Sequence, residues 1–156
     1  MKPIVIAILL ASVQLSSADD HYARARELYK GGPSKAPEII AELDLELRER
    51  PNNIEAHILK ALTQMGTNKL DDAIATFDAA EKEAQKAKTI YKNIPFFRAQ
   101  CFYYKGAFAE AQKSLKPFSG FFLGDKDEEA RYDNLMDAIN SKLKAAEKSE
   151  TKTEPK

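Results

Sequence analysis

The side chains best suited to nucleophilic or metal chemistry are few in this chain: one cysteine, Cys101, and two histidines, His21 and His57. A reactive thiolate needs a basic, partly exposed setting. Cys101 instead stands beside Phe102 in an aromatic segment, so we predict a buried core residue; an intermolecular disulfide is the alternative. The histidines belong to no HExxH pair or spaced Cys/His set. We therefore expect two surface imidazoles and no metal site.

The acidic run 125–129 alternates its carboxylates as the first part of an EF-hand calcium loop does. The glycine that such a loop requires is replaced by Ala130, and Met136 stands where its bidentate glutamate belongs. A helix start explains the run better. Asp125 is predicted to cap the helix and Glu128 to return the capping-box hydrogen bond, while the acids face the positive end of the helix dipole.

Sequence motifs for catalysis are missing. The 156 residues contain no GxSxG, no GxGxxG and no phosphate-binding glycine loop. The carboxylates fall on polar helix faces, where solvated side chains are the rule. The 24 basic residues equal the 24 acidic ones, without the basic excess typical of nucleic-acid binding. We therefore predict a non-catalytic protein that uses no cofactor and binds no nucleic acid.

The first eighteen residues have the layout of a secretory signal peptide. Lys2 precedes an apolar run, 4–13, and Ser16-Ser17-Ala18 places small residues before an acidic pair. The run is about half of the ~20 residues that span a bilayer. We expect cleavage after Ala18 and a periplasmic or secreted product with no stable membrane insertion; an uncleaved anchor is the alternative. With one cysteine, no intramolecular disulfide can form.

The remainder of the chain shows helical spacing of apolar residues, separated by glycine, proline and asparagine turns. The prediction is an all-α fold. Its seven helices are expected at 19–30, 36–50, 54–65, 70–88, 94–105, 107–116 and 126–146, with Asn93 capping the fifth. The stretch 147–156 has nothing to bury and is predicted to be a disordered tail.

The helices repeat in pairs. Shifting the sequence by 34 residues places Leu28 on Leu62, Ile40 on Ile74 and Leu43 on Phe77. A third unit is offset further, with Gly66 matched to Gly106 and Ala73-x3-Phe77 matched to Ala111-x3-Leu115. In that unit Ala99-x2-Phe102 followed by Gly106-x-Phe108-x2-Ala111-x3-Leu115 resembles the core of a tetratricopeptide repeat (TPR). The small residues of that motif let paired helices approach closely, and the bulky ones fill the gap beside them.

The resemblance implies antiparallel helix pairs stacked as a short right-handed solenoid. The units would cover 19–51, 52–92 and 93–118, with the helix 126–146 as a cap. The second unit is expected to have a turn about two residues longer than usual. Unit three departs from the family at Pro95 and Arg98, where large apolar groups are usual.

By the same resemblance, the first helix of each pair lines a concave groove that holds a peptide or protein partner. The family's groove positions fall on Asn93, Phe96, Gln100, Tyr103 and Tyr104, and in unit two near Glu55 and His57. Phe96 and Tyr103 have an alternative role as core residues. The resulting prediction is an adaptor or scaffold of the periplasm or cell envelope.

A self-associating structural component of the envelope is the alternative function. Association would use the third unit and the apolar loop 118–123. The competing expectation is that this loop tucks beneath the last helix.

Overall fold

The computed structural model describes residues 20–121 and 125–150. These residues form seven α-helices and two short 3-10 turns, without strands. The helices are α1 (His21–Tyr29), α2 (Ala36–Glu49), α3 (Ile54–Gly66), α4 (Leu70–Lys86), α5 (Asn93–Tyr104), α6 (Phe108–Leu115) and α7 (Lys126–Glu150). The 3-10 turns are η1 (Pro33–Lys35) and η2 (Lys116–Phe121). The all-α prediction is confirmed.

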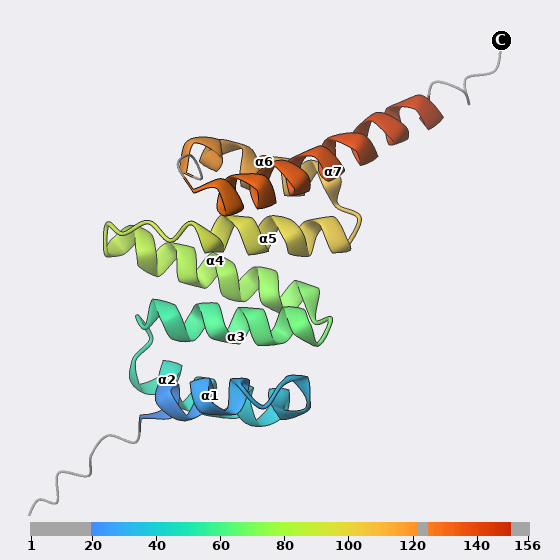
Figure 1. Ribbon diagram of the computed structural model, residues 1–156. Helices are drawn as coiled ribbons and strands as arrows, with labels where there is room; N and C mark the ends of the chain where they lie inside the picture. The colour runs from blue at the N-terminus through green and yellow to red at the C-terminus, as the bar shows by residue number, and fades with distance from the viewer. Residues whose placement is uncertain (1–19, 122–124, 151–156) are drawn as a thin grey trace, which may run out of the picture.

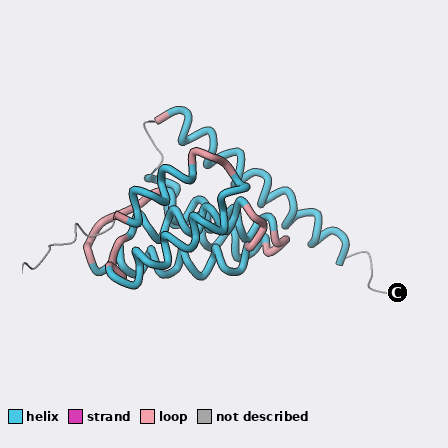
Figure 2. The backbone as a smooth tube through the Cα atoms, turned by 90° about the horizontal axis from the view of Figure 1, so that it is seen from below, coloured by secondary structure: helices cyan, strands magenta, loops and turns pink. Residues whose placement is uncertain are grey.

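The helices pack as three consecutive pairs, α1 with α2, α3 with α4 and α5 with α6, and α7 lies against the third pair. Figure 1 shows the pairs stacked from α1 at the bottom to α7 at the top. The C-terminal part of α7 runs out beyond the stack in both Figure 1 and Figure 2. None of the helices in the described parts of the chain is long and apolar enough to cross a membrane.

In each pair, both helices carry an almost fully buried residue at an equivalent position. The first helices bury Ala25, Ala61 and Ala99, and the second helices bury Ile39, Ala73 and Ala111, all at most 1% exposed. These positions lie fourteen residues apart in the first pair but twelve apart in the other two. The expectation of a longer turn in the second unit is therefore wrong, because the first pair carries the extra residues.

The turns of the second and third pairs have the same construction. Asn68 and Gly106 both adopt positive φ, 59° and 78°. The residue after each donates its backbone N–H to a carbonyl of the preceding helix, Lys69 to Gln64 and Ala107 to Phe102, at 2.9 Å in both cases. Asparagine and glycine are the residues that best tolerate this left-handed conformation. Asn68, and not Gly66, is thus the counterpart of Gly106, and a shift of 38 residues superposes the two first helices.

That register explains the departure of Arg98 from the family pattern. Its counterpart is Lys60, which pairs with Asp44 of α2 at 2.6 Å. Arg98 reaches back in the same way to α4, where it pairs with Asp78 at 2.9 Å and with Glu81. Its Nε also donates to the hydroxyl of Ser114 at 2.9 Å. In units two and three, the position therefore holds a cation that pairs with the second helix of the preceding unit.

Three local predictions change. His21 is 8% exposed, with Nδ1 2.7 Å from Glu42 Oε2, so it is a buried, bonded residue and not a surface imidazole. Asn93 is the first residue of α5 and makes no cap. α7 continues to Glu150, four residues past its predicted end, because helical propensity carries it beyond the point where packing stops.

The start of α7 agrees with its predicted cap in part. Asp125 Oδ1 accepts the backbone N–H groups of Asp127 and Glu128 at 3.0 and 3.1 Å. Glu128 pairs with Lys92 at 3.0 Å instead of returning a capping-box bond. In the loop before it, Phe118 packs against the cluster of α6 and α7 residues, as expected of a tucked loop. The predicted signal peptide and the loop residues 122 and 123 lie outside the described residues.

Candidate functional site

A hollow of about 470 Å³ lies between α5 and α7. It is lined by Phe96, Phe97, Gln100, Tyr103, Tyr104, Arg131, Asn134, Leu135 and Ala138. Four of the five groove positions predicted on α5 are therefore brought together in one concavity. The fifth, Asn93, lines an adjoining hollow of about 80 Å³ with Lys92, Phe96, Phe97, Glu128 and Arg131.

The two sides of α5 have different roles. Ala99 and Cys101 are fully buried against neighbouring helices, and this fixes the direction in which the rest of α5 points. Tyr104 remains 59% exposed. Tyr103 is partly buried, with its ring edge-on to Phe108 at 5.6 Å and to Tyr104 at 6.0 Å. Phe96 and Tyr103 thus combine the two positions considered for them, since each packs on the core and also lines the hollow.

The sequence did not predict the α7 wall of the hollow. Its lining residues Arg131, Asn134, Leu135 and Ala138 recur at helical spacing on one face. The sequence pattern assigns Leu135 to the core, and it is 9% exposed. Its polar neighbours, Arg131 and Asn134, have the sequence pattern of a solvent-exposed helix face. Nothing in the sequence indicates that this side of α7 lies opposite α5.

The two candidates from unit two lie elsewhere. Glu55 accepts a hydrogen bond from the Tyr91 hydroxyl at 2.8 Å, and this bond raises the pKa of Tyr91. His57 Nε2 lies 2.9 Å from the Pro51 carbonyl oxygen. In the 38-residue register Glu55 corresponds to Asn93, whereas His57 corresponds to Pro95, which is buried. The structure brings neither residue to the hollow between α5 and α7.

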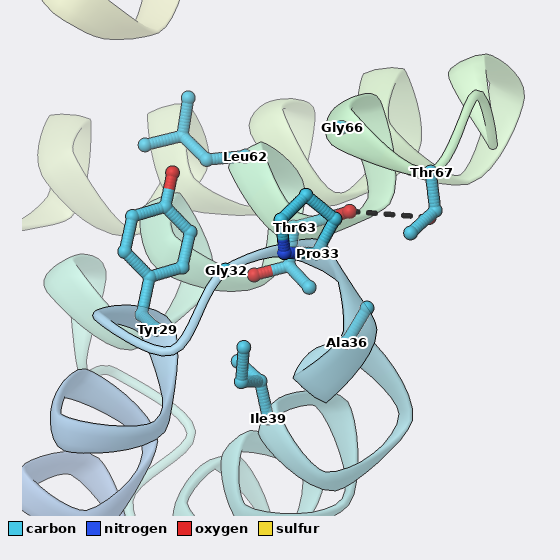
Figure 3. Close-up of a pocket in the computed structure, with 9 residues that line it drawn as sticks. All are labelled: Tyr29, Gly32, Pro33, Ala36, Ile39, Leu62, Thr63, Gly66 and Thr67. Atoms are coloured by element: carbon cyan, nitrogen blue, oxygen red, sulfur yellow. Dashed lines mark hydrogen bonds between the residues drawn. The ribbon is translucent and has the colours of Figure 1, made fainter.

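A separate cavity of about 280 Å³ lies between the first pair and the C-terminal end of α3. Figure 3 shows Tyr29 with its ring beside Leu62, and Gly32, Pro33, Ala36, Ile39, Thr63, Gly66 and Thr67 around them. Leu62 and Gly66 are the counterparts of Gln100 and Tyr104. The Thr67 hydroxyl donates to the Thr63 carbonyl at 3.1 Å. Positions that are polar or aromatic on α5 are therefore aliphatic or lack a side chain on α3.

The remaining reactive groups have structural settings. Burial raises the pKa of the Cys101 thiol to about 11, so it is protonated at neutral pH and is not a nucleophile there. Within residues 20–121 and 125–150, no three histidine, cysteine or acidic side chains are grouped to hold a metal ion. The hollow provides contact area and hydrogen-bonding side chains, which are features of a binding surface.

Comparison with known proteins identifies the fold. No family model and no curated protein matches the chain. It is similar to the type III secretion translocator chaperone SycD of Yersinia enterocolitica, with a TM-score of 0.70 and 18% identity over 80% of this chain and 83% of that one. SycD in complex with a peptide of the translocator YopD matches at 0.70 and 16%, over 85% and 98% of the two chains. A structure of SycD as an alternative dimer matches at 0.68 and 17%, over 79% and 91%. At these identities the likeness establishes a shared TPR-like helical fold.

Proposed function

We propose that this protein is a non-catalytic interaction module that binds a peptide segment of a partner protein in the hollow between α5 and α7. The observation that carries the proposal is the convergence of Phe96, Gln100, Tyr103 and Tyr104 with one face of α7 around a single concavity. Concave sites with aromatic walls and a few placed polar groups are typical of ligand binding. As an adaptor, the protein would act after export, in the periplasm, in the envelope or outside the cell.

The polar groups of the hollow suit a peptide main chain. Gln100 and Asn134 line the hollow and Asn93 lines the adjoining one. Within the described residues none of these three carboxamides makes a hydrogen bond to another part of the chain. A carboxamide both donates and accepts, so it can satisfy the N–H and C=O groups of a bound backbone. The tyrosine rings supply contact area at a small cost in side-chain entropy.

The SycD structures support this proposal through shape. One of them contains a translocator peptide, so a fold of this plan has room for a peptide ligand. The identity of the partner does not transfer at 16% identity, and we propose only the class, a peptide or an extended segment of a protein.

The proposal is tested by substituting groove residues that the fold does not need. Gln100→Ala together with Tyr104→Ala should weaken capture of the partner from an envelope extract while the melting temperature changes by only a few degrees. Ile90→Ala is the matched control, because Ile90 is 61% exposed and lies outside the hollow. Unchanged capture by the double variant would move the binding site elsewhere.

Self-association is the second candidate function. The observation in its favour is that a structure of similar fold is a dimer. Sedimentation at two protein concentrations separates the two functions, since a self-associating component shifts to larger species at the higher concentration. A monomer at both concentrations would contradict self-association.

A further inference from the structure

We infer that the bound segment carries an internal acidic residue next to an apolar one, and that Arg131 of the capping helix recognises its carboxylate. The inference rests on the proposed peptide-binding function and specifies the chemistry of the ligand. It also assigns to α7, the helix that ends the solenoid, part of the recognition surface.

The charges around the two hollows leave one cation uncompensated. Among the described residues, Arg131 is the sole charged one lining the larger hollow, and the smaller hollow adds Lys92 and Glu128. Those two pair with each other at 3.0 Å. Arg131 is exposed, and across residues 20–121 and 125–150 it makes no hydrogen bond or ion pair. A ligand that brings a carboxylate would therefore complete the charge pairing of the site.

Arg131 differs from two arginines that are tied to the scaffold, and from the equally unpaired Arg48 by lining a hollow. Arg98 pairs with Asp78 and Glu81, and Arg50 pairs with Glu46. These pairs hold the scaffold together. Arg131 has no such pair within the described part of the chain, although Glu128 lies one turn before it on α7. A planar guanidinium with five donors suits a carboxylate in two-point geometry.

The position of Arg131 favours an internal acidic residue over a chain terminus. It lines both hollows, so it stands where the two adjoin. A segment crossing both hollows would pass Arg131 with residues on each flank. In the larger hollow Phe96, Tyr103 and Leu135 form an apolar wall, and an apolar side chain of the ligand would bury there.

The test is a random-peptide display selection on the protein purified from cells. The wild type should enrich peptides with aspartate or glutamate beside an aliphatic or aromatic residue. Arg131→Glu should reverse the preference toward lysine or arginine. A selected acidic peptide should bind Arg131→Gln about fivefold more weakly than wild type, mainly through slower association, and the difference should shrink as salt is added.

Controls separate this inference from the proposed function. Lys142→Gln removes one exposed positive charge from the same helix outside both hollows and should leave binding unchanged. Peptides that need Gln100 and Tyr104 but show no acidic preference and ignore Arg131 would overturn the inference alone. Acidic peptides that lose binding when their C-terminus is amidated would show recognition of a terminus and overturn it too. An empty selection, or peptides indifferent to all three residues, would overturn both.

Discussion

The first helices of units two and three, α3 and α5, share one register and differ in what they present. Both bury an alanine against their partner helix, Ala61 and Ala99, and both end in the same left-handed turn. The groove positions of α3 are Ile58, Leu62 and Met65, which pack on the central core. Those of α5 are Phe96, Gln100 and Tyr103, which line the hollow facing α7, although Phe96 and Tyr103 also pack against the core.

The difference shows that the repeated residues specify how the helices pack, while the residues at the outer positions specify the surface that each helix presents. On α3 the outer positions are aliphatic, and burying them contributes to stability. On α5 the outer positions combine rings with an amide, and α7 faces them across the hollow. Substitutions at equivalent positions of the two units can therefore test which positions stabilise the fold in both units and which differ in role.

The largest effect is expected where the two units are alike. Phe77 and Leu115 occupy the same bulky position of the second helices, and both are 0% exposed. Phe77→Ala should lower the free energy of unfolding by about 3–5 kcal/mol and Leu115→Ala by about 2–5 kcal/mol. Urea denaturation measures both. A small loss at one site only would show that the two units do not share a scaffold.

Overpacking at the helix contact should come next. Ala73→Leu and Ala111→Leu place a larger side chain at fully buried positions and should each cost about 1–3 kcal/mol. Ala145→Leu, on the exposed end of α7, is the control and should be close to neutral. Equal shifts of the melting temperature in all three variants would contradict the pairing of the helices.

The units also differ at the position occupied by Thr63 and Cys101. The Thr63 hydroxyl donates to the Leu59 carbonyl, whereas Cys101 carries a buried thiol whose pKa is raised to about 11. In the unfolded chain the thiol ionises near its ordinary pKa of 9.0, while the folded protein still holds the proton. The stability of the protein should therefore fall as pH rises from 9 to 11, with this group contributing up to roughly 2 kcal/mol of the loss.

Denaturation at pH 8 and pH 11 should show a smaller loss for Cys101→Ala than for wild type, and the difference is the contribution of the thiol. The wild type should also react slowly with a thiol reagent under native conditions. Rapid labelling of the folded protein would place Cys101 nearer the surface than the structure does.

The smallest effect concerns the divergent positions themselves. Leu62→Ala on α3 should lower the free energy of unfolding by about 1–2 kcal/mol, because it removes a partly buried side chain that packs against the core and lines the cavity. Its counterpart Gln100→Ala should stay within about 0.5 kcal/mol. Thermal unfolding of the two variants checks the comparison, and equal losses would show that the outer face of α5 supports the core as much as that of α3.

Helix periodicity and small residues by themselves determined much of this protein. The seven helices, their pairing and the buried Cys101 follow from local spacing, because an amphipathic helix must bury its apolar face. The TPR resemblance, aligned on Ala99, Phe102 and Ala111, added the four α5 side chains that the structure brings to one hollow; their role in binding stays a prediction.

Tertiary structure decided what local spacing cannot encode. The left-handed turn at Asn68 and the longer turn of the first pair set the register between units, and both depend on backbone conformation more than on side-chain pattern. His21 has the sequence context of a surface residue because its partner Glu42 lies 21 positions away. The hollow depends on how α7 lies against α5, and the two helices are far apart in the sequence. The polar face of α7 that lines the hollow has the same sequence pattern as a solvent-exposed face.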